Sequence, residues 1–168
     1  TGLKLSFPVA ELLTGLATFR GTGRRFELKG TVHGVRVIDD YGHHPTEIHV
    51  TLEAARRFAD EGRLIVIFQP HRYSRTKAFA AEFAQELNQA DRAILLEVYA
   101  ASEKPIDGVS SRMITAMMNK GEYIPNFVEV TDSVIADAQP GDVIMTLGAG
   151  DVSSLAPIIV EGLARRFG

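Results

Sequence analysis

The chain has 168 residues, of which 45% are hydrophobic and 23% charged, and its formal net charge is −3. Such a chain can bury a core without disulfides, and its mild acidity argues against nucleic-acid-binding and membrane-surface proteins, which carry basic stripes. The absence of cysteine excludes disulfides, thiol catalysis and cysteine–zinc sites, and it fits a reducing cytoplasm. No apolar run approaches the roughly 20 residues of a membrane span, and nothing resembles a signal peptide.

The first part of the chain differs from the rest. The sequence begins with Thr1 rather than methionine, and residues 9–19 have loosely helical spacing of apolar side chains. Gly2, Pro8 and Gly15 interrupt the first 20 residues, so they do not make a convincing domain of their own. We therefore expect the chain to be a piece of a longer protein.

Beyond residue 23, short apolar runs alternate with amphipathic stretches. Residues 25–29 and 32–38 alternate as strands do, with Gly34 at a tight turn or bulge. Continuous apolar runs predict buried strands at residues 64–68, 93–98 and 143–147, and residues 127–130 predict a short strand. Apolar residues at helical spacing predict helices at residues 45–62, 76–88, 113–118 and 153–167. The alternation predicts an α/β fold, with a mostly parallel sheet and helices on both faces.

Polar residues follow directly after several of the predicted strands. These stretches are Asp-Asp-Tyr-Gly-His-His-Pro at 39–45, Gln-Pro-His-Arg-Tyr-Ser-Arg at 69–75, Tyr-Ala-Ala-Ser-Glu at 99–103 and Gly-Ala-Gly-Asp at 148–151. In a parallel sheet all these strand ends lie along one edge, and open α/β sheets bind ligands outside that edge. The sequence therefore predicts a ligand site there.

The acids and imidazoles after the strand at 32–38 allow more than one interpretation. Asp39 and Asp40 can cap the following turn, but we do not expect both to be structural. Neighbouring side chains such as His43 and His44 point in different directions, and zinc sites favour wider spacing. A single histidine acting by hydrogen bonding or proton transfer is therefore favoured over a metal site.

Two arginines stand three residues apart at the start of a predicted helix. Cations at that end oppose the helix dipole, so a compensating anion is expected near Arg72 and Arg75. A ligand carboxylate or phosphate can supply it, held by the guanidinium fork. The alternative is an ion pair with Asp39, Asp40 or Glu103, and we favour the ligand.

Glycine-rich residues 148–150 could likewise let backbone N–H groups approach an anion, although such turns often serve only tight packing. The dinucleotide fingerprint, the GxxxxGK[ST] phosphate loop and a Ser-His-Asp arrangement are not present in this sequence.

Two long motifs resemble those of the Mur ligase family. They are Val-Ile-Asp-Asp-Tyr-Gly-His-His-Pro-Thr-Glu at 37–47 and Phe-Gln-Pro-His-Arg-Tyr-Ser-Arg-Thr at 68–76. Residues 21–26, 99–103 and 147–151 resemble further family motifs and follow in the same order. Two positions depart from the family pattern, because Ser102 stands where glycine is expected and Gly23 where a basic residue is common.

The resemblance implies an ATP-dependent acid–amino-acid ligase of peptidoglycan synthesis, acting in the cytoplasm in cell wall biogenesis, cell shape and cell division. Family members have a sugar-binding domain, a central ATPase domain and a Rossmann-like C-terminal domain. The resemblance identifies residues 26–168 as the C-terminal domain and residues 1–25 as the tail of the central one. ATP and Mg²⁺ would then be bound mainly by the central domain. We expect no metal site or complete catalytic set here, and no activity from this part alone.

Within the family, the motifs are most similar to those of members that add L-alanine to UDP-N-acetylmuramate through an acyl phosphate. The resemblance implies that ATP is contacted by Arg25 and Asp40. It implies that L-alanine and the reacting carboxylate are surrounded by Tyr41, His43, Arg72 and Arg75. Members that join a tripeptide to the same UDP-sugar are the nearest alternative. A stand-alone module that binds a nucleotide or an amino acid is an alternative of another class.

Overall fold

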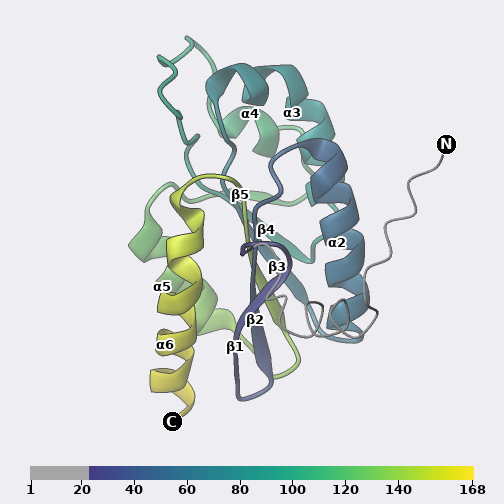
Figure 1. The fold of residues 1–168 in the computed structure, drawn as a ribbon, viewed down its shortest axis with the longest axis vertical. Coiled ribbons are helices and arrows are strands. Elements are labelled where there is room, and N and C mark those ends of the chain that lie inside the picture. Colours follow the sequence, from purple (N-terminus) through teal and green to yellow (C-terminus); the bar gives the residue numbers. More distant parts are fainter. Residues whose placement is uncertain (1–22) are drawn as a thin grey trace, which may run out of the picture.

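The computed structural model describes residues 23–168, so the helix expected at residues 9–19 lies outside the described part. A six-stranded sheet forms the centre, in the order β1-β2-β6-β3-β4-β5 (Figure 1). Its strands are β1 (Glu27–Val32), β2 (Val35–Asp40), β3 (Leu64–Phe68), β4 (Arg92–Leu95), β5 (Gly121–Tyr123) and β6 (Val143–Leu147). β1 pairs antiparallel with β2, and the other pairs are parallel. The predicted α/β fold with a mostly parallel sheet is confirmed.

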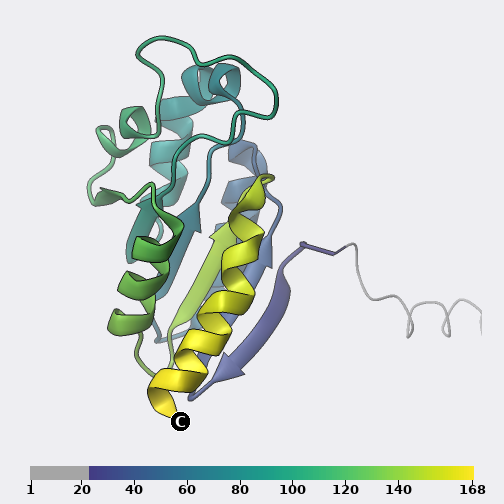
Figure 2. The ribbon, with the colours of Figure 1, turned by 90° about the vertical axis from the view of Figure 1, so that its left-hand side faces the viewer.

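Helices cover both faces of this sheet (Figure 2). They are α2 (Pro45–Ala59), α3 (Tyr73–Leu87), α4 (Arg112–Thr115), α5 (Phe127–Asp137) and α6 (Leu155–Phe167), with the 3₁₀ turn η1 (Asp151–Ser154) before α6. One core cluster joins α2, α3 and α4 to the sheet and includes Val66 and Phe83. The other joins α5 and α6 to the opposite face and includes Ile65 and Ile159. Successive residues of β3 thus point to opposite cores, as its continuous apolar run predicts.

The last strand of the chain lies in the middle of the sheet, between β2 and β3. Its final residue, Leu147, is in register with Asp40 at the end of β2 and with Phe68 at the end of β3. Phe68 is in turn paired with Leu95 at the end of β4. The polar stretches that follow these residues therefore begin at the same level of the sheet.

The β1–β2 hairpin contains the tight turn predicted at Gly34. Val32 pairs with Val35, and both residues between them have positive φ, 47° for His33 and 82° for Gly34. This is the pattern of a two-residue turn whose twist matches that of the strands. Glycine suits the second position because it has no Cβ to clash there.

The strand expected at residues 127–130 is wrong, because these residues begin helix α5. The side-chain oxygen of Asn126 accepts hydrogen bonds from the N–H groups of Val128 (2.8 Å) and Glu129 (3.1 Å) and so caps the helix. Val130 and Val134 then face the core at helical spacing. The segment Phe-Val-Glu-Val is too short to distinguish the two periods. The short β5 occupies the sheet edge instead.

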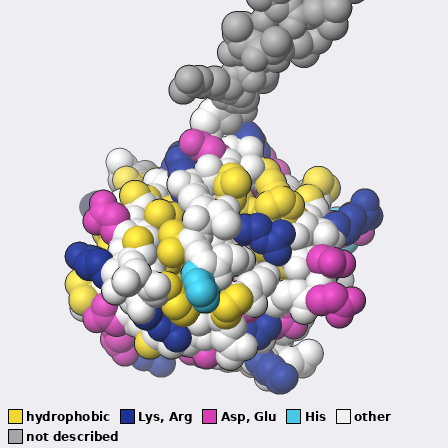
Figure 3. Space-filling model, turned by 90° about the horizontal axis from the view of Figure 1, so that it is seen from below, with side chains coloured by type: hydrophobic (Ala, Val, Ile, Leu, Met, Phe, Trp, Pro, Cys, Tyr) yellow, Lys and Arg dark blue, Asp and Glu magenta, His cyan; other side chains and the backbone are white. Residues whose placement is uncertain are grey.

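The two ends of the parallel sheet differ in character. Figure 3 views the molecule from below in Figure 1, at the amino ends of the parallel strands, where acidic, basic and apolar side chains are interspersed. The predicted ligand residues lie at the opposite end. Within residues 23–168, no helix is long and apolar enough to cross a membrane.

Replacing Asn126 with alanine removes the cap of α5. We expect Asn126→Ala to lower the free energy of unfolding by about 1 kcal/mol. For a protein of this size, that corresponds to a fall in Tm of about 2–4 °C. Asn126→Asp keeps a capping oxygen and should retain the wild-type Tm. Equal losses in both variants, measured by thermal unfolding, would contradict the assignment of the cap.

Candidate ligand site at the carboxyl edge of the sheet

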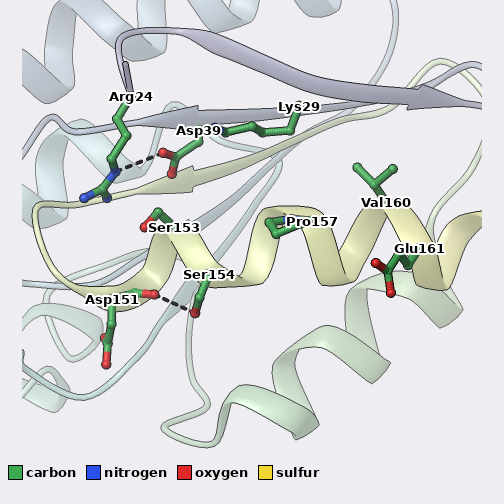
Figure 4. Close-up of a pocket in the computed structure, with 9 residues that line it drawn as sticks. All are labelled: Arg24, Lys29, Asp39, Asp151, Ser153, Ser154, Pro157, Val160 and Glu161. Carbon is green, nitrogen blue, oxygen red and sulfur yellow. Dashed lines mark hydrogen bonds and ion pairs between the residues drawn. The ribbon is translucent and has the colours of Figure 1, made fainter. Parts of the chain in front are cut away.

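A fully buried carboxylate at the end of β2 joins three segments. Asp39 accepts hydrogen bonds from Nε of Arg24 (3.0 Å) and from the hydroxyl of Thr146 (2.7 Å). The other guanidinium nitrogens of Arg24 donate to the carbonyls of Gly148 (2.5 Å) and Gly150 (3.3 Å). Figure 4 shows this side chain reaching from the segment before β1 towards Asp39. Arg24 therefore ties that segment to β2 and to the loop after β6.

The neighbouring Asp40 is also held by protein groups. Its oxygens accept hydrogen bonds from the N–H groups of Phe26 (2.7 Å) and Gly42 (2.7 Å) and from the hydroxyl of Thr51 (3.2 Å), and only 4% of the residue is exposed. These bonds use three of about four acceptor positions of a carboxylate. Both aspartates thus have structural partners, against the expectation that only one would.

Helix α2 begins with a capping box. The side chain of His44 accepts a hydrogen bond from the N–H of Thr46 (3.4 Å), and Glu47 accepts from the N–H groups of His43 (3.0 Å) and His44 (3.2 Å). Burial alone would raise the pKa of Glu47, but these bonds and the charges nearby lower it below its usual value. The carboxylate is therefore ionised when it accepts from the turn.

The two adjacent imidazoles have different neighbours. His44 packs edge-on against Phe79, with 5.0 Å between ring centroids, whereas His43 packs edge-on against Tyr41 at 5.1 Å. The described residues 23–168 contain no group of three or more His, Asp or Glu side chains suited to hold a metal ion. Of the two imidazoles in this turn, only His43 packs beside Tyr41 at the edge of the sheet.

Four rings form a continuous row across the ends of β2, β3 and β4, which we call the aromatic row: Tyr41, His43, His71 and Tyr99. Successive ring centroids are 5.1, 5.7 and 5.6 Å apart. Tyr41 and His43 were predicted as site residues, but His71 and Tyr99 were not. Both lie in the polar stretches, yet only the pairing of the segments after β3 and β4 brings them together.

Arg25 lies at one end of the aromatic row. Its guanidinium is 5.8 Å from the ring centroid of Tyr41, and its Nη1 is 3.9 Å from Oε1 of Glu47. Half of the side chain (51%) is exposed, so such an ion pair contributes little to stability. Arg25 therefore remains accessible to an anionic ligand.

The hydrogen bonding of His43 defines its tautomer. Nδ1 lies 3.0 Å from the carbonyl oxygen of Tyr41, and a carbonyl can only accept. Nδ1 must then carry a proton, and in the neutral form of the ring Nε2 is the acceptor. His43 is therefore arranged to accept a hydrogen bond from a ligand.

The second imidazole of the row is held in its neutral form. Burial lowers the pKa of His71, positive charge on His43 lowers it further when that ring is protonated, and so do the charges of Arg75 and Arg72, while Glu103 opposes them. His71 is therefore uncharged at neutral pH and adds no charge to a site that already contains arginines.

Arg72 and Arg75 are brought together at the start of α3, as the sequence predicted. Nη1 of Arg75 is 3.5 Å from Nδ1 of His71. Arg72 is the N-cap, with a positive φ of 72°, and its N–H donates to the carbonyl of Tyr99 (2.8 Å). In the described part of the chain, neither guanidinium lies within 4.0 Å of a carboxylate oxygen.

The carboxylates considered as partners for these arginines are used elsewhere. Asp39 and Asp40 have the partners described above. Glu103 accepts hydrogen bonds from the N–H (2.9 Å) and hydroxyl (2.6 Å) of Ser74. The hydroxyl of Ser74 is the largest cause of the lowered pKa of Glu103, followed by its N–H, and Arg72 contributes through its charge. Glu103 thus bonds to Ser74 at the start of α3 rather than to the guanidinium group of Arg72 or Arg75.

A tight turn delivers Glu103 to this position. The N–H of Glu103 donates to the carbonyl of Ala100 (2.9 Å), and the two residues between have positive φ, 47° for Ala101 and 72° for Ser102. Glycine tolerates this conformation best. The departure at Ser102, where the family pattern has glycine, therefore falls at a position with a physical preference for that residue.

The glycine-rich loop after β6 serves close packing in this structure. A Cβ on Gly148 would lie 2.6 Å from the carbonyl oxygen of Gln69, and this loop turns its carbonyls towards Arg24. Gln69 is 5% exposed and bonds to both the side chain of Asp151 (2.7 Å) and the N–H of Val152 (3.1 Å). The packing alternative is thus supported over an anion-binding loop.

A cavity of about 590 Å³ lies beside this loop, between β1 and the start of α6 (Figure 4). Its lining includes the Arg24–Asp39 pair together with Lys29, Ser153 and Glu161. Lys29 is already paired with Glu27, at 2.8 Å. This lining has charges of both signs and so favours no class of ligand, whereas Arg72 and Arg75 at the start of α3 favour an anion.

Residues 24–150 match the model of the Mur ligase, glutamate ligase domain. The chain therefore belongs to the Mur ligase family, which is consistent with its sheet and the position of its polar turns. It is 51% identical over 168 residues to the UDP-N-acetylmuramate–L-alanine ligase of Mycobacterium ulcerans (strain Agy99), an alignment that covers 98% of this chain and 34% of that protein. The chain thus spans about a third of the length of the curated relatives that it matches.

Solved structures show the same architecture. The UDP-N-acetylmuramate–alanine ligase of Thermotoga maritima is 28% identical with a TM-score of 0.75, covering 95% of this chain and 34% of that one. A murein peptide ligase from Psychrobacter arcticus is 23% identical with a TM-score of 0.72, covering 89% and 32%. The second likeness shows the fold alone.

Arg24 offers a direct test of the buried ion pair. Arg24→Met leaves Asp39 buried without its cation, and we expect the free energy of unfolding to fall by about 3 kcal/mol. Arg57→Met is the matched control, because the Arg57 side chain is 81% exposed and lies 3.8 Å from Glu53. We expect that change to cost less than about 0.5 kcal/mol. Similar losses for both variants in urea unfolding would contradict the anchoring role of Arg24.

Proposed function

We propose that this chain is the C-terminal domain of a ligase that adds L-alanine to UDP-N-acetylmuramate at the expense of ATP. The observation that carries the proposal is the pair of guanidinium groups of Arg72 and Arg75, which lack a carboxylate partner within residues 23–168 and stand beside the aromatic row. An amino acid brings a carboxylate that suits such a fork. The names of the mycobacterial relatives support this choice of substrate.

The amino-acid substrate would lie between the arginines and the row. Arg72 and Arg75 bind its carboxylate, and their charge also stabilises negative charge that develops on the reacting carboxyl group. Nε2 of His43, the free acceptor of that ring, accepts a hydrogen bond from the amine and orients its lone pair. Tyr41 packs against His43 and keeps its ring in place.

ATP, when bound, would supply the phosphoryl group that activates the muramoyl carboxylate. The exposed guanidinium of Arg25 suits a phosphate or other anionic group at the domain junction. Asp40, with one acceptor position left, would chiefly hold Phe26 and Gly42 and thereby the residues next to them. We propose that Mg²⁺ is bound mainly by the other domains.

The setting proposed for this activity is the cytoplasm, in the synthesis of peptidoglycan and hence in cell shape and division. The partners are UDP-N-acetylmuramate, L-alanine, ATP and the preceding domains of the same enzyme. Because the sugar and phosphate-loop domains supply the rest of the site, we expect this domain alone to be inactive.

The substrate is tested with the full-length protein. ATP hydrolysis and product formation are measured with UDP-N-acetylmuramate and either L-alanine or the tripeptide of the alternative ligases. We expect turnover with L-alanine. Turnover with the tripeptide alone would favour the recycling ligase instead, and turnover with neither would favour a binding module.

The arginines are tested in the same assay. Arg72→Ala and Arg75→Ala should each lower kcat/KM for L-alanine by about 100-fold or more, because a charge-assisted bond to the substrate is lost. Lys77→Ala, at an exposed position of the same helix, is the matched control and should behave as wild type. Wild-type kinetics in both arginine variants would show that these cations do not contact the substrate.

A further inference from the structure

Tyr99 lies at the far end of the aromatic row, after β4, and stacks on an imidazole from the segment after β3. The rings of Tyr99 and His71 have centroids 5.6 Å apart and planes only 13° from parallel. Tyr99 is one of the large side chains that remain exposed, at 38%. Its ring thus covers one face of His71 while its other side reaches solvent and the glycine-rich loop.

Backbone contacts hold Tyr99 in register with His71. The N–H of Tyr99 donates to the carbonyl of Pro70 (2.8 Å), and its carbonyl accepts from the N–H of Arg72 (2.8 Å). The two residues form a parallel bridge beyond the ends of the named strands. The same exchange of hydrogen bonds therefore positions both the imidazole of His71 and the backbone of Arg72.

The loop after β6 confines the ring from a second direction. A Cβ on Gly150 would lie 2.8 Å from Cγ and 2.9 Å from Cβ of Tyr99, closer than real contacts of this kind. Glycine is therefore required for the tyrosine to pack this closely. The side chain is fixed by the segments after β3, β4 and β6 together.

This arrangement leaves His71 little freedom. Its ring lies between Tyr99 and His43, 5.7 Å from the centroid of His43, and its Nδ1 faces Arg75 at 3.5 Å. The charged and titratable groups around it are Arg72 and Arg75 of α3, His43 from the β2–α2 turn and Glu103 from the loop after β4. Movement of the His71 ring would therefore alter the surroundings of both arginines.

We propose that Tyr99 is a positioning residue for the amino-acid site. It acts through the stack on His71 and so keeps the side chains of His43, His71 and Arg75 in the positions that the substrate needs. This role rests on the proposed function. It requires the flat ring of Tyr99 rather than its hydroxyl, because the stack is the contact with His71. Simple filling of space would instead be met by any apolar side chain of similar bulk.

The experiment compares Tyr99→Phe and Tyr99→Leu in the full-length enzyme, with KM measured separately for L-alanine and ATP. Tyr99→Phe keeps the stacked ring and should therefore have the wild-type KM and kcat. Tyr99→Leu should raise KM for L-alanine about 10- to 100-fold, because a misplaced binding group costs that much. KM for ATP should not change. Tyr123→Phe is the control, since it removes the bond to Glu97, close to the same loop, without touching the stack.

Two further readouts separate positioning from packing. Without the covering ring, His71 becomes more hydrated and its pKa rises towards the ordinary value, so the acid limb of kcat/KM should move to higher pH in Tyr99→Leu. In a His71→Ala background, Tyr99→Leu should have little additional effect on KM, because the group through which it acts is gone. Tyr99→Met replaces the leucine variant if the latter does not fold.

The outcomes distinguish this inference from the proposed function. If the wild-type enzyme uses L-alanine but Tyr99→Leu retains its KM and pH profile, the positioning role is overturned and the proposed function stands. Fully additive effects in the double variant would also overturn it. If the wild-type enzyme does not use L-alanine at all, the proposed function itself is wrong.

Discussion

Two buried carboxylates at the end of β2 organise this edge of the protein. Asp39 neutralises Arg24, whose guanidinium also bonds to the loop after β6. Asp40 accepts hydrogen bonds from the N–H groups of Phe26, before β1, and Gly42, in the β2–α2 turn. Buried carboxylates are unfavourable without such partners. The pair therefore fixes the segment before β1, the β2–α2 turn and the β6 loop relative to one another. Arg25 and Tyr41 adjoin the residues held in this way.

The consequence for function is a division of labour between cations. Arg24 has a structural role, because it pairs with Asp39, while Asp40 bonds to Phe26 and Gly42. Neither acid is therefore available to Arg72 and Arg75. Glu103, the remaining candidate partner, instead satisfies the start of α3 through Ser74. Two guanidinium groups are left beside the aromatic row, an arrangement suited to a small zwitterion such as an amino acid.

Much of the fold was predictable, because buried parallel strands have continuous apolar runs and helices have their own period. Residues 127–130 were mistaken for a strand because four residues are too few to show a period; the cap at Asn126 marks the helix start, and Val130 and Val134 show the helical spacing. The site was predictable as a set of strand ends. The insertion of β6 between β2 and β3, and the stack of Tyr99 on His71, were not, because both depend on pairing between segments distant in the chain.

The central claim is that Arg72 and Arg75 receive the carboxylate of the amino-acid substrate. The most direct measurement is a crystal structure of the full-length protein with L-alanine and a non-hydrolysable ATP analogue. The account predicts an alanine carboxylate oxygen within hydrogen-bonding distance of at least one of these guanidinium groups, with the amine turned towards His43. A carboxylate bound elsewhere, with both arginines paired to acidic side chains of another domain, would contradict it.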